Sequence, residues 1–202
     1  MTSLKTDAFI SQPLQGEGQH NCTLTDLTDL ARVGLRGADS AAYLQARGYR
    51  LPGHPNQALR QDDGGWVARL STNEYLLLGS ISDQGARVAA EEAAWVQDDQ
   101  RNYLLPRQDS HAWLVLQGEH CSAVMAKLCG VDLRAEAFAN GSVAQTSAAR
   151  INVIVINVGN EQMPALTILF DLASLAYFTG ALLDAMAEFG ADLEMFQSTA
   201  AH

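Results

Sequence analysis

The amino-acid sequence predicts an α+β fold made of two similar sheet-and-helix lobes related by a pseudo-twofold axis. The first observation behind this prediction is an internal duplication. The apolar strand pattern Ala31–Gly37 recurs as Ala112–Gly118, and each copy ends at a glycine. The second observation is that both copies continue in the same order, with a helix, a connection, a hairpin and another helix. Two such lobes bury their sheets by packing together, so we expect one cooperative unit.

The elements of the first lobe follow from periodicity and turn residues. After the strand at 31–37, a helix is expected to end near Gly48, because a glycine suits the left-handed position that follows a helix. Trp66–Leu70 and Tyr75–Leu78 flank a polar turn and predict a hairpin. An amphipathic helix is expected over residues 83–96.

The second lobe repeats this order. Gly130 takes the place of Gly48 after the first helix of the lobe, and we expect the same left-handed conformation there. Ile151–Ile156 and Leu166–Phe170 predict the second hairpin. The final helix is expected to run from Ser174, a favourable N-cap residue, to about Phe189.

The chain divides into an arm, one two-lobed domain and a short tail. The expected boundaries are 1–23 for an extended N-terminal arm, 24–194 for the domain, with lobes of about 24–100 and 101–194, and 195–202 for a frayed tail. Residues 49–65 contain Pro52, Gly53, Pro55 and the pair Gly64-Gly65, which favours a long loop over regular structure. A loop of this length usually carries a function or a contact.

Composition limits the possible partners. Apolar residues make up 48% of the 202-residue chain and charged residues 18%, which is enough apolar material for a folded interior. The formal net charge of −10, with scattered arginines, argues against nucleic acid as a general partner. Three cysteines without a CxxC pair argue against a disulfide framework or a zinc site and favour reduced thiols.

Membrane and export signals are not expected. The first twenty residues lack the apolar core and cleavage site of a secretory signal. The most apolar stretch, residues 165–183, contains Asp171 and fits a buried strand followed by a core helix better than a membrane span. We therefore expect a cytoplasmic protein.

A search for chemistry finds no catalytic residue, no metal set and no phosphate-binding motif. Glu119, His120 and Cys121 are consecutive at the start of a predicted helix, where side chains point about 100° apart and do not converge. A helix N-terminus can lower a thiol pKa, so a reactive Cys121 stays open as a lesser alternative. Asp171, at the junction of an apolar strand and a helix, is the best carboxylate candidate, although a helix-entry contact is favoured for it.

Several short motifs then indicate a known family. They are Leu51-Pro52 with Pro55-Asn56, Asn73-Glu74-Tyr75-Leu76-Leu77, Asp132-Leu133, Phe138, Gly141 and Thr146, and Ser174-Leu175-Ala176. In this order they resemble the gamma subunits of heterotetrameric sarcosine oxidases, within the folate-binding-type domains that include the glycine-cleavage T-protein. The chain departs from that pattern at Ser71-Thr72, in place of a Gly-Pro turn, and at Ala173, in place of a basic residue. The additional C-terminal barrel of a full T-protein is not expected.

The resemblance implies a noncatalytic subunit without activity of its own. The complex would demethylate sarcosine to glycine, with tetrahydrofolate as the one-carbon acceptor. FAD, FMN, NAD and tetrahydrofolate would bind to other chains of the complex, and this chain would bind no cofactor. Its partners would be larger flavin-containing subunits and a small zinc-binding subunit. The arm and the 49–65 loop, with Leu51, Pro52, Pro55 and Asn56, are the expected subunit contacts.

Alternatives remain open at this point. The chain could instead be a stand-alone folate-binding protein of the aminomethyl-transfer type, using a groove in which Asp171 is the candidate carboxylate. A redox or metal protein built on Cys121 and Cys129 is unfavourable, because eight residues, about two helical turns, separate them. Whether the complex oxidises sarcosine or another N-methyl amine also stays open.

Overall fold

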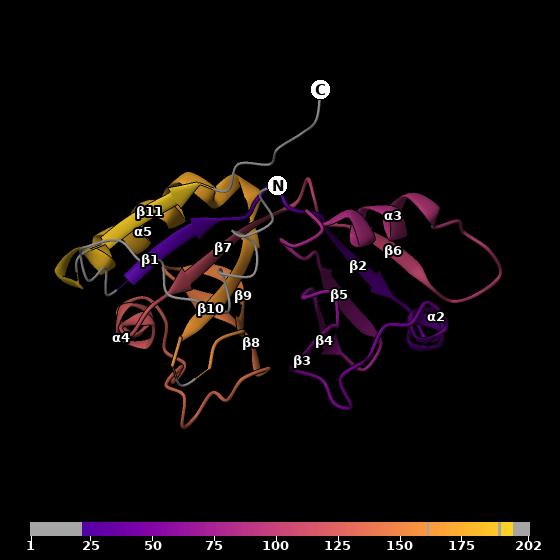
Figure 1. The fold of residues 1–202 in the computed structure, drawn as a ribbon, viewed down its shortest axis with the longest axis horizontal. Coiled ribbons are helices and arrows are strands. Elements are labelled where there is room, and N and C mark those ends of the chain that lie inside the picture. The colour runs from indigo at the N-terminus through magenta and orange to yellow at the C-terminus, as the bar shows by residue number, and fades with distance from the viewer. Residues whose placement is uncertain (1–21, 161, 190, 196–202) are drawn as a thin grey trace, which may run out of the picture. The chain divides into compact units, whose positions relative to one another are not determined.

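The structure, a computed structural model, describes residues 22–160, 162–189 and 191–195, and these form two compact units. One unit contains residues 29–111 and 141–143, and the other contains the described residues up to 28 together with 112–140 and those from 144 onward. Each unit pairs a sheet with helices, as Figure 1 shows, so the expected α+β class is confirmed. The expected arm at 1–23 and tail at 195–202 lie almost wholly outside the described residues.

The unit of residues 29–111 is built on a five-stranded antiparallel sheet. Its strands, in spatial order, are β3 (Gln57–Arg60), β4 (Trp66–Ser71), β5 (Glu74–Leu78), β2 (Arg32–Arg36) and β6 (Tyr103–Pro106). Helices α2 (Ser40–Ala46) and α3 (Ala86–Ala94) complete the unit. Val33 and Leu35 alternate along β2 and pack with Leu44 of α2 and Val88 of α3, so one face of the sheet and the two helices share a core.

The other unit is built on a six-stranded sheet. Its strands, in spatial order, are β11 (Ala191–Met195), β1 (Cys22–Asp26), β7 (His111–Gln117), β10 (Ala165–Asp171), β9 (Ile151–Asn157) and β8 (Val143–Ala148). Helices α4 (Cys121–Ala126) and α5 (Leu175–Met186) supply Val124, Phe178 and Leu182 to its core. Two 3₁₀ turns, η1 (Leu172–Ser174) and η2 (Ala187–Phe189), flank α5.

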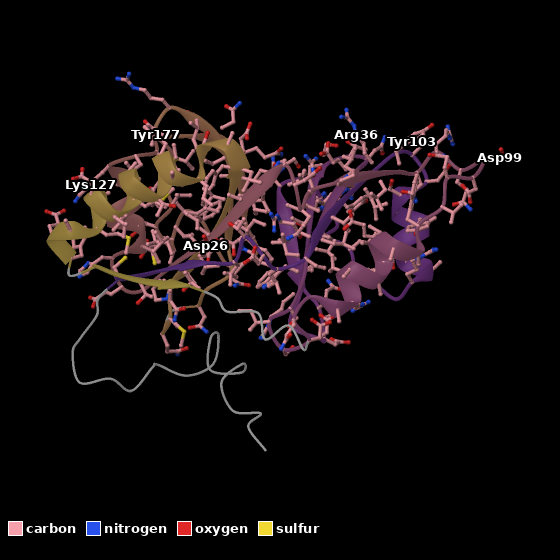
Figure 2. All side chains as sticks on the ribbon, turned by 90° about the horizontal axis from the view of Figure 1, so that it is seen from above. Asp26, Arg36, Asp99, Tyr103, Lys127 and Tyr177 are labelled. Atoms are coloured by element: carbon pink, nitrogen blue, oxygen red, sulfur yellow. The ribbon has the colours of Figure 1, made fainter. Side chains whose placement is uncertain are left out.

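The duplication extends to the strand order, and it includes an exchange of strands. The orders β3-β4-β5-β2-β6 and β8-β9-β10-β7-β1 match position by position, and β11 is added beside β1. β1 precedes β2 in the chain but pairs with β7, whereas β6 precedes β7 but pairs with β2. Arg36 lies opposite Tyr103 in the β2–β6 pair, and Figure 2 shows the two side by side. Each sequence half therefore gives one strand to the sheet of the other half.

The predicted strands and helices of both copies are present, and three details differ from expectation. The 49–65 segment contains a strand, β3, because its backbone pairs with β4 from Gln57 to Arg60. Gly48 has the expected positive φ of 77°, but Gly130 does not adopt the left-handed conformation. Ser174 precedes α5 as expected, but its hydroxyl makes no capping hydrogen bond. Within the described residues, no helix has the length and apolar character needed to span a bilayer.

Candidate functional site

The reactive side chains singled out from the sequence are used in packing. Cys22, Cys121 and Cys129 are all buried free thiols. Among the described residues, no group of three or more histidine, cysteine, aspartate or glutamate side chains is arranged to hold a metal ion. The three cysteine side chains therefore belong to the hydrophobic core of the six-stranded unit.

The run Glu119-His120-Cys121 does not form a site. The thiol of Cys121 donates to the carbonyl oxygen of Gly118 at 2.8 Å, and burial raises its pKa well above the ordinary value. Burial of the thiol therefore argues against the alternative of a reactive Cys121 at the helix N-terminus, which stays untested. The ring of His120 stacks on Phe189 with centroids 4.6 Å apart, and Glu119 is exposed.

Asp171 makes the helix-entry contact that its position favours. The residue is exposed at the end of β10, and its Oδ1 accepts the backbone N–H of Ala173 at 2.9 Å. This bond satisfies one of the free donors at the start of the helical segment, the task expected of Ser174. A role for Asp171 in a folate groove stays a prediction.

The expected subunit contacts lie on a well-defined loop ahead of β3. Leu51 is half-buried and Pro52 is buried, whereas Pro55 and Asn56 are exposed. Asn56 has a φ of 59°, a left-handed conformation that asparagine tolerates better than most residues. Its backbone N–H donates to the carbonyl of Arg69 at 2.7 Å, which joins the loop to β4.

Two side chains that the sequence did not single out hold this loop. Arg69, on β4, donates to the carbonyl of Gly53 at 2.8 Å and to that of Pro52 at 3.3 Å. Gln61, only 5% exposed, exchanges hydrogen bonds with the backbone of Arg50 at 2.9 and 3.0 Å. Both roles depend on the pairing of β3 with β4, which no local sequence pattern indicates.

The sequence of this chain was compared with protein families and with curated proteins over its whole length. No protein-family model matches the chain. It is 27% identical over 182 residues to sarcosine oxidase subunit gamma from Corynebacterium sp. (strain P-1), and the match covers 88% of this chain and 86% of that protein. The chain resembles a sarcosine oxidase gamma subunit. The resemblance indicated by the short motifs is therefore confirmed over most of the length of both chains.

Solved structures confirm the fold. A chain of heterotetrameric sarcosine oxidase from Corynebacterium sp. U-96 matches with a TM-score of 0.70 and 24% identity, covering 87% of this chain and 88% of that one. The glycine cleavage system aminomethyltransferase T from Bartonella henselae matches with a TM-score of 0.61 and 15% identity. That match covers 86% of this chain and 48% of the transferase, so the gamma-like chain spans about half its length. The expected T-protein-type fold is thus present.

Proposed function

We propose that this chain is the noncatalytic gamma subunit of a sarcosine-oxidase-like heterotetramer. The observation that carries the proposal is the similarity to sarcosine oxidase subunit gamma, which covers 88% of this chain and 86% of that protein. Near-complete coverage on both sides is what a shared subunit role requires, because a fold alone does not define a function.

The local structure supports a binding role for the chain itself. Cys121 is directed into the core, His120 packs on Phe189, and Asp171 caps a helical segment. Each of these groups thus has a structural partner that accounts for its place in the sequence. The loop at Leu51–Asn56, in contrast, presents an exposed surface on a fixed backbone.

The remaining parts of the proposal concern the assembly. The partners are larger flavin-containing subunits and a small zinc-binding subunit, in the cytoplasm. FAD, FMN, NAD and tetrahydrofolate belong to these other chains, and the complex demethylates sarcosine. Within this chain, residues 24–194 act as one two-lobed domain, and Leu51, Pro52, Pro55 and Asn56 belong to the loop that meets a partner. The buried Pro52 serves to shape this loop.

Affinity purification from the source organism tests the assembly. The tagged full chain is expected to bring down larger chains at fixed stoichiometry, with flavin absorbance and sarcosine-dependent peroxide formation in the purified complex. The isolated chain is expected to be colourless and inactive toward sarcosine. Turnover by the isolated chain, or its recovery without other subunits, would contradict the proposal.

The alternative of a stand-alone aminomethyl-transfer protein is not favoured. The likeness to the aminomethyltransferase is 15% identical in sequence and therefore concerns the fold alone. Titration calorimetry of the isolated chain with tetrahydrofolate distinguishes the two. We expect the isolated chain not to bind tetrahydrofolate with micromolar affinity. Micromolar binding that is lost in Asp171→Asn would instead support a folate groove and the aminomethyl-transfer alternative.

A further inference from the structure

Two asparagine side chains join the loop ahead of β8 to the end of β9. The Nδ2 of Asn140 donates to the carbonyl of Gly159 at 2.6 Å, and the Nδ2 of Asn157 donates to the carbonyl of Phe138, also at 2.6 Å. The Oδ1 of Asn157 accepts the N–H of Gly159 at 3.0 Å. Each asparagine thus holds the backbone close to the other asparagine. We call these three hydrogen bonds the asparagine clasp.

The two asparagines differ in the residue that follows them. Asn140 precedes Gly141, whereas Asn157 precedes Val158, and Asn140-Gly141 is the only Asn-Gly pair in the chain. An asparagine loses ammonia when the backbone nitrogen of the next residue attacks its Cγ. A glycine has no Cβ to shield that nitrogen, whereas a β-branched valine hinders the attack. Asn140 is therefore the chemically labile member of the clasp.

The local structure requires both residues of this Asn-Gly pair. Gly141 has a φ of 78°, and a Cβ there would lie 2.6 Å from the carbonyl oxygen of Ala58, so a residue with a side chain does not fit. The carbonyl of Gly141 also accepts the N–H of Ala58 at 2.6 Å. Asn140 supplies the donor that the carbonyl of Gly159 accepts. The labile pair thus results from two separate contacts of the fold.

The backbone nitrogen of Gly141 has no hydrogen bond to lose, but it is shielded. Within the residues that the structure describes, its N–H donates to no acceptor. Gly141 is buried, however, and the side chain of the exposed Asn140 is held by Gly159. Hydroxide therefore reaches this nitrogen, and Cγ of Asn140 turns toward it, only after the clasp opens locally.

We propose that Asn140 is a site of spontaneous deamidation and that opening of the asparagine clasp sets its rate. Hydroxide takes the proton from the nitrogen of Gly141, which then attacks Cγ of Asn140. The new N–Cγ bond replaces the Cγ–Nδ2 bond, and Nδ2 leaves as ammonia with a proton from water. Water then opens the cyclic imide at either carbonyl, which leaves an aspartate or an isoaspartate at position 140.

The product no longer closes the clasp. An aspartate places a carboxylate oxygen, which only accepts hydrogen bonds, against the carbonyl of Gly159. An isoaspartate adds a methylene to the backbone ahead of Gly141 and displaces the contact of that residue with Ala58. We therefore expect modification of this one residue to loosen the loop ahead of β8.

The first test follows the mass of peptides from the full-length chain during incubation at mildly alkaline pH. We expect deamidation at Asn140 and none at Asn157, and a rate at Asn140 roughly tenfold lower in the folded chain than in urea. Equal rates in the folded and unfolded chain would show that the clasp does not control the reaction. A folded chain that stays unmodified over about a hundred half-lives of the unfolded reaction would overturn the site.

The second test opens the clasp without touching Asn140. Asn157→Asp removes the donor to Phe138 but keeps an oxygen for the N–H of Gly159, so we expect deamidation at Asn140 to become several-fold faster. Asn160→Asp introduces the same charge nearby and keeps an oxygen for the N–H of Met163. It is the matched control and is expected to leave the rate unchanged.

An unchanged rate in Asn157→Asp, or the same increase in both variants, would overturn the role of the clasp. Circular dichroism verifies that each variant is folded. If Asn157→Asp does not fold, the wild-type chain in urea below its unfolding transition replaces it. There the deamidation rate is expected to rise in proportion to amide exchange at Gly141, and a rate that does not follow this exchange would contradict the proposal.

Discussion

Ala149 and Arg150 form a strained turn between β8 and β9. Their φ values are 46° and 68°, so two consecutive residues with side chains adopt the left-handed conformation. A two-residue hairpin turn of this kind ordinarily contains Asn-Gly. The backbone is held by Tyr177 of α5, whose hydroxyl donates to the carbonyl of Ala149 at 2.9 Å. Figure 2 shows Tyr177 on the outer side of its unit, where it is 56% exposed.

This turn yields a stability prediction. Replacing Ala149→Asn together with Arg150→Gly is expected to raise the free energy of unfolding by about 1 kcal/mol, because both residues suit the positive φ. Tyr177→Phe, which removes only the hydroxyl, is expected to lower it by about 1 kcal/mol. Urea denaturation followed by circular dichroism measures both, and a loss of stability in the Asn-Gly variant would contradict the assignment of strain.

The environment of Tyr49 makes the protein sensitive to alkali. Burial raises the pKa of Tyr49 from 10.0 to about 12, against the opposing effect of Arg87, whose guanidinium lies 4.0 Å from the ring centroid. Between pH 10 and 12 the unfolded tyrosine loses its proton first, so the folded state binds more protons and its stability falls as the pH rises.

The measurement is the free energy of unfolding at several pH values from 8 to 12. Tyr49→Phe is expected to reduce the slope above pH 10, although Tyr43, whose pKa is also raised to about 12 by burial, keeps part of it. An unchanged slope in the variant would show that Tyr49 ionises equally in the folded and unfolded states.

At the scale of elements, local patterns predict what depends on local sequence. The strands at Ala31–Gly37 and Ala112–Gly118 and the helix after Ser174 carry clear periodicity, and the structure contains them. β3 was missed because only Ala58 of its four residues is buried, which leaves no alternation to detect. Its pairing with β4 is what brings Arg69 opposite Gln57 and places its guanidinium near the loop. The loop could therefore be predicted from prolines and glycines, but the residues that fix it could not.

The exchange of β1 and β6 gives an element-scale prediction. Leu24, on β1, is fully buried in the core of the six-stranded unit, so Leu24→Ala is expected to cost about 2–5 kcal/mol. Amide exchange is expected to rise more in β7 and β11 than in β2 and β5, although Leu24 precedes β2 in the chain. Leu35→Ala, in the core of the other unit, is the control and is expected to give the reverse pattern. Equal effects of both variants in both units would contradict this localisation.

For the whole molecule, the strand exchange predicts that the sequence halves depend on each other. A cut after Asp99, in an exposed segment, separates β6 from the sheet that contains β2 and separates β1 from the sheet that contains β7. Fragments 1–99 and 100–202 are each expected to remain unfolded alone and to regain native circular dichroism when mixed. A native-like spectrum of either fragment by itself would contradict this expectation.

The duplicated fold itself was accessible from the sequence, because the repeated order of elements survives in glycines and apolar patterns. The exchange of strands could not be predicted, because Cys22–Asp26 alternates over only five residues and Tyr103–Pro106, with the sequence Tyr-Leu-Leu-Pro, does not alternate. Neither pattern says which sheet the segment joins. The sequence predicts lobes of about 24–100 and 101–194, whereas the structure places β1 in the six-stranded sheet and β6 in the five-stranded sheet.

The reciprocal pairing of β1 and β6 has a consequence for how such a chain can arise. A precursor with one copy of the repeat and the same strand pairing would complete its sheet with the outer strand of a second molecule. Its folding would therefore depend on protein concentration. Fusing the copies end to end keeps each copy close to the copy that supplies its outer strand, at a high effective concentration. By such a fusion an intertwined homodimer would become a single chain whose two copies are free to diverge, and in this chain the six-stranded sheet has β11 in addition to the five shared positions.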